Sequence, residues 1–227
     1  MSPSELNKEI QQIIMTASSD KCTISMSDLN GSIEDYHEKL PPDQKYMTRC
    51  TVKAYGADDD GQKVADIGFM NAVFFEAEAV FMEETTFPML CDALSSDADE
   101  MAAAITDRQG SLKPSICSPD QNILYVEGLF VAEWCRGHGA GRYLLDNMIP
   151  MLSHSLNLYP HVCILLPYPQ IIDAYGTLRN MDGNTDVELP RLTRFYEKAG
   201  YQKIEGSECM YKKNAGPLDE LFELLGV

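Results

Sequence analysis

The chain has 227 residues, 44% of them hydrophobic and 23% charged, which is the composition of a globular protein and excludes a disordered or fibrous one. Its 18 lysines and arginines against 35 aspartates and glutamates give a formal net charge of −17. A chain this acidic is repelled by phosphate backbones and anionic lipid, which argues against nucleic acid and membrane as partners and favours a cationic partner.

The seven cysteines are widely spaced, and no two form a Cys-x-x-Cys pair. Structural zinc takes closely spaced thiolates, and a disulfide framework takes an even number of cysteines in a small chain. We therefore predict free thiols, no metal site and a reducing compartment. The N-terminus shows no signal-peptide pattern, and no apolar run approaches the length of about 18 residues that a membrane span needs, so a cytoplasmic protein is expected.

The N-terminal part of the chain is predicted to hold a helix, a strand and a second short helix. Ser4 stands where it can cap a helix that extends to Ile13 and Ile14, because the apolar residues after it share one helical face. Residues 22–27 alternate and are rich in β-formers, which predicts a strand. A short helix is expected over residues 33–40, where two prolines end it.

A β-hairpin is the strongest local prediction in the first half of the chain. The runs 47–55 and 64–75 favour strands, and residues 57–61 between them, Ala-Asp-Asp-Asp-Gly, close with the Asp-Gly pair typical of hairpin turns. The acidic turn lacks the first aspartate and the closing glutamate of a calcium-binding loop. We therefore interpret it as a solvated turn.

Residues 76–121 carry no recognisable chemistry and are predicted to form an insertion of helix and loop within a single domain, 1–227. The helix is expected from Phe87 towards Thr106. Residues 107–121 contain one glycine and two prolines, which indicates a loop.

The second half is predicted to alternate between strands and helices. Residues 123–131 are a mostly apolar strand, and residues 143–156 have the apolar spacing of a helix. Residues 161–166 form a second strand that is apolar on both faces, which favours a central position beside the first.

The stretch 167–189 is predicted as a loop, and its length in a compact domain indicates a function. Pro190 fits the first turn of a helix that reaches Ala199, and Gly200 ends it. A closing hairpin and a terminal helix are expected at residues 201–205, 209–213 and 218–225.

Residues 136–142, Arg-Gly-His-Gly-Ala-Gly-Arg, stand between a predicted strand and a predicted helix. Successive glycines let backbone amides turn towards a ligand, and the helix N-terminus adds partial positive charge. An ordinary tight turn would need only one or two glycines. The segment therefore predicts an anion site, to which two arginines add cations.

Two familiar phosphate-binding loops do not fit this segment. A Walker A loop ends in Gly-Lys-Ser/Thr, whereas residues 141–143 are Gly-Arg-Tyr, and the glycine spacing differs from the Gly-x-Gly-x-x-Gly of a dinucleotide loop. What fits at every fixed position is Arg/Gln-x-x-Gly-x-Gly, at residues 136–141. Residues 195–201, Phe-Tyr-Glu-Lys-Ala-Gly-Tyr, match a second, later motif. On these two motifs the chain resembles the GNAT superfamily of acyl-CoA-dependent N-acetyltransferases.

The resemblance implies an α/β fold with a mixed, mostly antiparallel central sheet, flanking helices and splayed central strands. It implies acetyl-CoA as the cofactor, with its pantetheine arm paired to a strand backbone. The residues that would bind acetyl-CoA are, on the strand, Leu129, Phe130 and Val131 and, in the loop that would hold the pyrophosphate, Arg136, Gly137, His138, Gly139, Ala140, Gly141 and Arg142.

Two residues are candidates for proton transfer. Tyr196 stands where family members often carry the tyrosine that protonates the leaving thiolate, and the alternative is a core aromatic. Glu127 is the preferred base or amine-binding group, and the alternative is a structural ion pair. On a regular strand Glu127, Leu129 and Val131 point to one face.

The implied function is transfer of an acetyl group to a primary amine of a cationic acceptor, either a small molecule or a lysine or N-terminus of a protein. Leu189 stands where the family commonly has asparagine, and segments 76–121 and 167–189 have no counterpart in the minimal fold, so both are expected to wall the acceptor site. The alternative is a catalytically idle module that binds CoA or a partner protein. A homodimer is compatible with either hypothesis.

Overall fold

The computed structural model describes residues 12–22, 47–76, 87–172, 178–180 and 185–214. Its strands are β1 (Gln12–Cys22), β2 (Met47–Ala57), β3 (Lys63–Phe75), β4 (Ile123–Val131), β5 (Val162–Leu165), β6 (Gln170–Ile172), β7 (Leu178–Asn180), β8 (Gln202–Lys203) and β9 (Met210–Lys213). Its helices are α3 (Phe87–Leu94), α4 (Ser96–Ile105), the short 3-10 helix η2 (Glu133–Cys135), α5 (Ala140–Leu156) and α6 (Thr185–Lys198).

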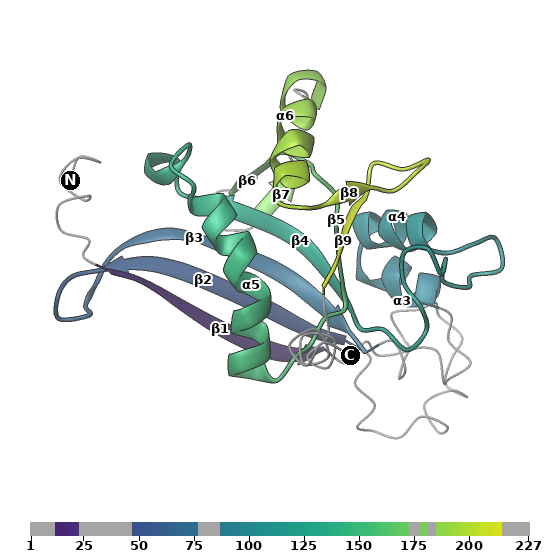
Figure 1. Ribbon diagram of the computed structural model, residues 1–227, viewed down its shortest axis with the longest axis horizontal. Coiled ribbons are helices and arrows are strands. Elements are labelled where there is room, and N and C mark those ends of the chain that lie inside the picture. Colours follow the sequence, from purple (N-terminus) through teal and green to yellow (C-terminus); the bar gives the residue numbers. More distant parts are fainter. Residues whose placement is uncertain (1–11, 23–46, 77–86, 173–177, 181–184, 215–227) are drawn as a thin grey trace, which may run out of the picture.

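The centre of the molecule is a seven-stranded sheet in the order β1-β2-β3-β4-β5-β9-β8, with β6 and β7 as a separate pair (Figure 1). In this sheet β4 and β5 run parallel, and every other neighbouring pair runs antiparallel. The fold class expected from the sequence, a mixed and mostly antiparallel sheet with flanking helices, is therefore confirmed.

The central strands separate part-way along. β4 pairs with β5 only over Ile123–Val126, where the register ends at Leu165, so the rest of β4 has no β5 partner. At the same point the β3–β4 register slips, because Ala72 pairs with Val126 and Asn71 with Gly128. Residue 127 is therefore a β-bulge, and such an extra residue bends a strand and increases its twist. The splayed central strands expected from the resemblance are confirmed.

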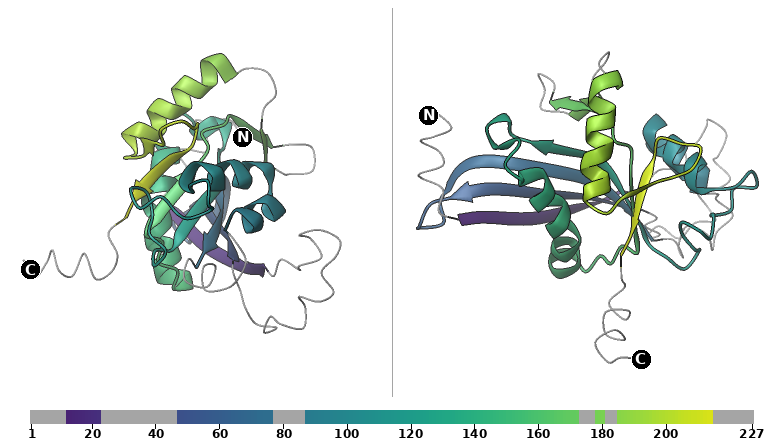
Figure 2. Two further views of the ribbon diagram at one scale, coloured as in Figure 1. Left: turned by 90° about the vertical axis from the view of Figure 1, so that its right-hand side faces the viewer. Right: turned by 45° about the horizontal axis from the view of Figure 1, so that its top comes forward.

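Helices cover the two faces of the sheet differently. α5 crosses one face, where it and α6 share an apolar cluster with alternate residues of β2, β3, β4 and β5 (Figures 1 and 2). α3 and α4 lie against the other face at the end where β3 finishes and β4 begins, packed on Val73, Phe75 and Tyr125. Segment 76–121 thus contributes a core cluster through the helices of its described part, 87–121.

The predicted hairpin is confirmed by β2 and β3. Its turn is held by Asp58, whose Oδ1 accepts hydrogen bonds from the amides of Asp60 (3.1 Å) and Gln62 (2.8 Å). Gly61 has a φ of +76°, a conformation that L-residues with side chains rarely adopt.

Four local predictions are corrected by the structure. Ile13 and Ile14 lie in β1 and not in a helix, because β1 pairs with β2 along its whole length. The single helix expected from Phe87 is two, divided at Ser95, whose Oγ caps α4 by accepting the amide of Ala98.

The segment expected as a loop, 167–189, contains the β6–β7 hairpin and the start of α6. Pro190 consequently lies inside α6 rather than in its first turn, at the cost of one backbone hydrogen bond. The helix ends as expected, with Gly200 at a φ of +89°. Residues 4–11 of the helix predicted from Ser4, the helices predicted at 33–40 and 218–225, and residues 23–27 of the predicted strand lie outside the described residues.

Candidate functional site

The predicted anion site is a loop that joins β4 to α5. Gly137 and Gly139 have φ angles of +77° and +88°, and a Cβ added to either would meet no atom within 4 Å. The backbone conformation, rather than crowding, therefore requires glycine at both positions. His138 between them is exposed, with its Nδ1 2.9 Å from the carbonyl oxygen of Arg136.

The N-terminus of α5 is left open towards this loop. Gly139 is its N-cap and supplies no side-chain hydrogen bond, and the first turn holds no acidic residue. The first amides of a helix have no partner within the helix, and together with the helix dipole they favour an anion. The 17-residue helix α5 therefore presents backbone donors, beside Ala140 and Gly141, where the sequence predicts a phosphate group.

The two arginines of the loop also brace the structure. Arg136 Nε donates to the carbonyl of Val131 (2.9 Å), and its guanidinium lies 5.7 Å from the centre of the Phe130 ring. Arg142 Nε donates to Asp146 (2.6 Å), and its Nη1 donates to the carbonyl of Lys198 in α6. Arg136 thus ties the loop to the end of β4, and Arg142 ties α5 to α6.

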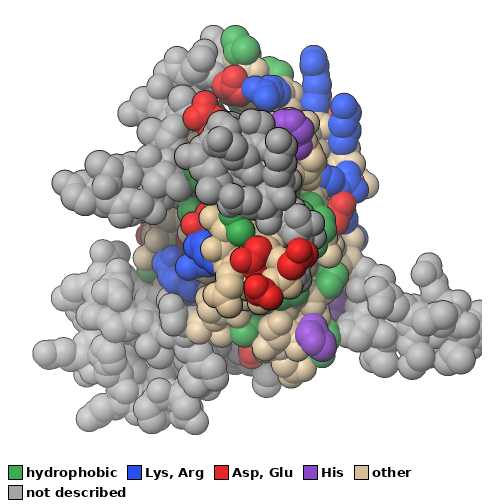
Figure 3. Space-filling model, turned by 90° about the vertical axis from the view of Figure 1, so that its left-hand side faces the viewer, with side chains coloured by type: hydrophobic (Ala, Val, Ile, Leu, Met, Phe, Trp, Pro, Cys, Tyr) green, Lys and Arg blue, Asp and Glu red, His purple; other side chains and the backbone are tan. Residues whose placement is uncertain are grey.

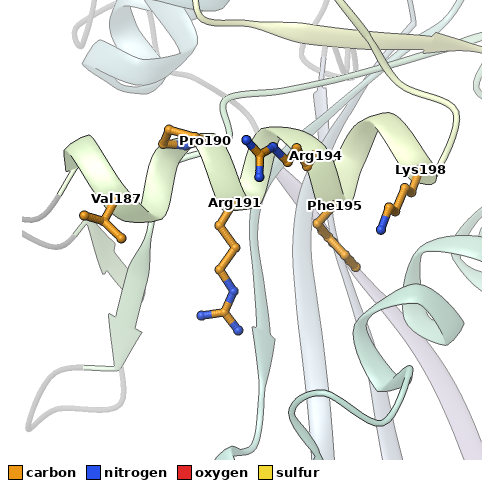
Figure 4. A pocket seen from close by; sticks show the side chains of 6 residues that line it. All are labelled: Val187, Pro190, Arg191, Arg194, Phe195 and Lys198. Atoms are coloured by element: carbon orange, nitrogen blue, oxygen red, sulfur yellow. The ribbon is translucent and has the colours of Figure 1, made fainter.

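A pocket of about 580 Å³ lies along α6. In Figure 4, Arg191, Phe195 and Lys198 extend from the helix in the same direction, into the space beneath it. Figure 3 shows lysine and arginine side chains gathered along the upper right of the molecule, at the level of α6. The pocket is lined by Val187, Pro190, Arg191, Arg194, Phe195 and Lys198.

The pocket adjoins the glycine loop. A Cβ on Gly141 would stand 3.3 Å from the Phe195 ring and 3.4 Å from a methyl group of Val131. The ring of Phe195 therefore lies against the first turn of α5, which in turn lies against Val131 at the end of β4. The helix N-terminus, the end of β4 beyond its β5 pairing and the pocket residue Phe195 thus meet around Gly141.

The cations of α6 were missed by the sequence reasoning. Arg191, Arg194 and Lys198 are three of only 18 lysines and arginines in a chain of net charge −17. With Phe195 they follow the spacing of three and four residues that places side chains on one helical face. This spacing, within the helix predicted from Pro190, was the signal in the sequence that could have revealed a basic face.

Glu127 is the bulged residue of β4, at the point where β4 leaves β5. Its carboxylate accepts from Arg49 Nη1 at 3.1 Å (Oε1) and 3.4 Å (Oε2). Arg49 lies on the side of the sheet opposite α5, whereas Leu129 and Val131 pack towards α5. The prediction that Glu127 shares a face with Leu129 and Val131 is therefore wrong, because the bulge shifts the alternation of the strand by one residue.

Compared with a carboxyl group in water, the Glu127 carboxyl is shifted towards its protonated form. Burial raises the pKa of the Glu127 carboxyl above its ordinary value, and the charge and hydrogen bond of Arg49 oppose this rise. The Glu127 backbone carbonyl accepts from Gln170 Nε2 at 2.8 Å, so the segment predicted to lie on the acceptor side contacts the bulge itself.

Tyr196 lies in the apolar cluster on the α5 side, with only 7% of its surface exposed. Its ring packs at steep angles against Phe195 (centroids 5.0 Å apart) and Tyr201 (5.8 Å). Burial raises the pKa of its phenol well above the ordinary value, so the hydroxyl keeps its proton at neutral pH. The two candidate catalytic residues therefore approach the splayed strands from opposite faces of the sheet.

The described part of the chain holds neither a cluster of metal ligands nor a membrane-spanning helix. There no group of three or more His, Cys, Asp or Glu side chains is placed to hold a metal ion. None of the described helices has both the length and the apolar character needed to cross a bilayer. The six cysteines whose side chains are described are buried and free.

Comparison with protein-family models and with curated proteins gave no match. Solved structures that are similar to this chain include N-acetyltransferases. NAA60 from Arabidopsis thaliana, in complex with acetyl-CoA, is 14% identical, with 88% of this chain and 100% of that chain covered and a TM-score of 0.36.

Two further structures show the same range of similarity. The spermidine/spermine N-acetyltransferase SpeG from Vibrio cholerae is 14% identical, with 89% and 95% of the two chains covered and a TM-score of 0.32. A KacTA–DNA complex is 9% identical, with 95% and 98% covered and a TM-score of 0.38. Similarity this remote adds nothing to what the sheet topology establishes about the fold.

Proposed function

We propose that this chain is an acetyl-CoA-dependent N-acetyltransferase that acts on a primary amine. The observation that carries the proposal is that the open N-terminus of α5, the end of β4 beyond its β5 pairing and Phe195 of the α6 pocket meet around Gly141. Such a surface suits a ligand with three parts: a strand edge can pair with an amide-bearing arm, backbone amides can bind a pyrophosphate, and cations can bind a further phosphate.

Each part of this surface has a role in the proposal. The backbone of Leu129–Val131, which lies beyond the β5 pairing, binds the pantetheine arm. The amides of Gly137 and of Gly139 to Arg142 bind the pyrophosphate, while the His138 amide donates to the carbonyl of Cys135 and Arg136 keeps this loop against β4. The cations of α6 bind the remaining phosphate, and Phe195 offers an aromatic face to the adenine.

Two side chains handle protons. Acetyl-CoA supplies the acetyl group, whose bond to sulfur breaks as the bond to the amine nitrogen forms. Glu127 takes the proton that the attacking ammonium must lose, and its raised pKa brings it closer to neutrality, where a base is most effective. Tyr196, protonated at neutral pH, gives a proton to the departing thiolate.

The acceptor is a primary amine, on a small molecule or on a lysine or N-terminus of a protein. The net charge of −17 favours a cationic acceptor, because the field of the whole chain attracts cations and repels nucleic acid. A cytoplasmic location and a homodimer both fit this proposal, and neither is needed for it.

The cofactor site is tested by calorimetric titration of acetyl-CoA into the wild type and two variants. Gly139→Asp places a negative charge at the open helix N-terminus and a side chain at a φ of +88°. Gly206→Asp is its matched control, because Gly206 has a φ of +79°, nothing within 4 Å of an added Cβ, and a position in the β8–β9 turn.

We expect the wild type and Gly206→Asp to bind alike and Gly139→Asp to bind about tenfold or more weakly, because a fixed carboxylate repels phosphate where the amides would hold it. Equal binding by all three folded proteins would place the cofactor elsewhere. No binding by the wild type would exclude the proposed activity.

The second candidate is a catalytically idle module that binds CoA. The observation that favours it is the burial of Tyr196 in an apolar cluster, as a purely structural aromatic would be. The two candidates differ in thiol release from acetyl-CoA in the presence of amines. An idle module binds acetyl-CoA and releases no thiol above the rate seen without protein.

A further inference from the structure

The sheet face opposite α5 carries a polar strip beside the bulge of β4. Arg49, Thr51 and Lys53 alternate along β2 on this face, and Asn71 and Glu127 continue it on β3 and β4. Two contacts join the strands, Arg49 to Glu127 at 3.1 Å and Thr51 Oγ1 to Asn71 Oδ1 at 3.1 Å. α3 and α4 cover the neighbouring part of the face, around Val73 and Phe75 in β3.

The strip has more hydrogen-bond donors than acceptors. Both hydrogen bonds between Arg49 and Glu127 use the single atom Nη1, and among the described residues the N–H groups of Nε and Nη2 have no acceptor. Asn71 accepts through its Oδ1, and within the same residues the two N–H groups of its Nδ2 are unused. Lys53 adds three more. Among the described side chains of this strip, Glu127 is the one carboxylate.

We propose that the acceptor is an amino acid, a compound whose reacting amine lies beside a carboxylate. This inference rests on the proposed N-acetyltransferase function and names its substrate class. An ammonium and a carboxylate one carbon apart are complementary to the ion pair on the protein: Glu127 holds the ammonium, and the free N–H groups of Arg49, with Asn71 and Lys53, hold the carboxylate.

The position of the strip follows from the position of the cofactor surface. The glycine loop, Phe195 and the α6 pocket lie on the α5 side of β4, so the amine must reach the splayed strands from the other side. Glu127 stands at that point, with 25% of its side chain exposed. Arg49, 45% exposed, lies beside it.

Local charge and net charge act at different ranges here. The acidic chain as a whole attracts cations, but exposed charges more than a Debye length apart, about 8–10 Å, are largely screened. Within the strip Arg49 and Lys53 outnumber Glu127. A polyamine would place its ammonium groups against these two cations. An acceptor without a carboxylate would leave the hydrogen-bond donors of the strip unpaired, and a site built to bind a polar group strongly rejects analogues that lack that group.

The test compares acceptors that differ only in the carboxylate. Thiol release from acetyl-CoA is measured with the twenty amino acids, with their α-amides, and with putrescine and spermidine. Arg49→Gln is measured beside the wild type, and Arg108→Gln, an exposed cation in the turn after α4, is the control for loss of one charge. Calorimetry of acetyl-CoA with each protein reports the cofactor site independently.

We expect one or more amino acids to be acetylated with a kcat/KM about tenfold or more above that of the matching α-amide. Arg49→Gln should raise the KM for the amino acid, reduce its advantage over the amide and leave acetyl-CoA binding unchanged, whereas Arg108→Gln should behave as the wild type does.

Equal or faster acetylation of the amides or polyamines would overturn the inference and leave the proposed function standing. Binding of acetyl-CoA without turnover of any amino acid would overturn it too. Failure to bind acetyl-CoA would instead overturn the proposed function itself.

Discussion

The two sides of β4 are built in different ways. On the α5 side, the anion site comes from one continuous segment, in which Gly137 and Gly139 set the backbone and the helix follows at once. On the opposite side, the polar strip is assembled from β2, β3 and β4, and Arg49 and Glu127 are 78 residues apart in sequence. A backbone motif is visible in the sequence, whereas a side-chain platform exists only after the strands have paired.

This difference separates two kinds of measurement. Changes in the glycine loop and in the α6 pocket should act on acetyl-CoA affinity, whereas changes on the strip and at Tyr196 should act on the acceptor and on proton transfer. A variant that changes both acetyl-CoA affinity and acceptor kinetics would show that the two sides are not separate, and a variant that changes only one of them would support the separation.

The largest effect is expected for Glu127→Gln, which removes the base. We expect kcat to fall about 100-fold, the scale of general base catalysis, with the dissociation constant of acetyl-CoA unchanged. Steady-state kinetics and calorimetry on the same protein check both parts. Weakened acetyl-CoA binding would mean that the two faces are not separate; unchanged kcat would assign Glu127 to a structural ion pair.

Tyr196→Phe removes a hydroxyl and keeps the ring that packs against Phe195 and Tyr201. We expect turnover to fall by about tenfold or more, while acetyl-CoA affinity and the melting temperature stay close to those of the wild type. Tyr201→Phe is the matched control, because it removes a second buried hydroxyl from the neighbouring ring. Equal turnover by Tyr196→Phe and the wild type would show that the tyrosine is a core aromatic only.

The double variant Arg191→Gln, Arg194→Gln tests the α6 pocket. These two exposed cations are expected to contribute modestly, so the dissociation constant of acetyl-CoA should rise about fivefold, and its dependence on salt should weaken. Titrations at two salt concentrations measure both effects. A change in acceptor KM without a change in acetyl-CoA affinity would move this pocket to the acceptor side.

The smallest effect is a shift in pH dependence for Arg49→Gln. Burial raises the pKa of Glu127 and Arg49 lowers it, so the pKa rises further when the cation is removed. Because the base acts in its ionised form, the acidic limb of the kcat/KM profile should move to higher pH. Profiles of the wild type, Arg49→Gln and Arg108→Gln check this, and a shift to lower pH would contradict the assignment of Glu127 as the base.

Much of the scaffold was predictable because its signals are local. The β2–β3 hairpin, the strands at β4 and β5 and the end of α6 at Gly200 follow from alternation, turn residues and glycine, which act over a few neighbours. The errors lie where tertiary pairing overrides local preference. Ile13 and Ile14 have helical spacing but lie in β1, which pairs with β2 along its whole length. The N-cap residue Ser95 divides a continuous apolar pattern into two helices.

The loop at 136–142, which we propose as the anion site, follows from the sequence alone, because its glycines with positive φ and the helix N-terminus are adjacent along the backbone. The face that Glu127 takes, by contrast, depends on how the strands pair. A one-residue bulge turns its carboxylate away from Leu129 and towards Arg49, since alternation along a strand holds only while the register holds. The ion pair between Glu127 and Arg49, on which the proposed class of acceptor rests, depends on strand pairing between segments far apart in the chain.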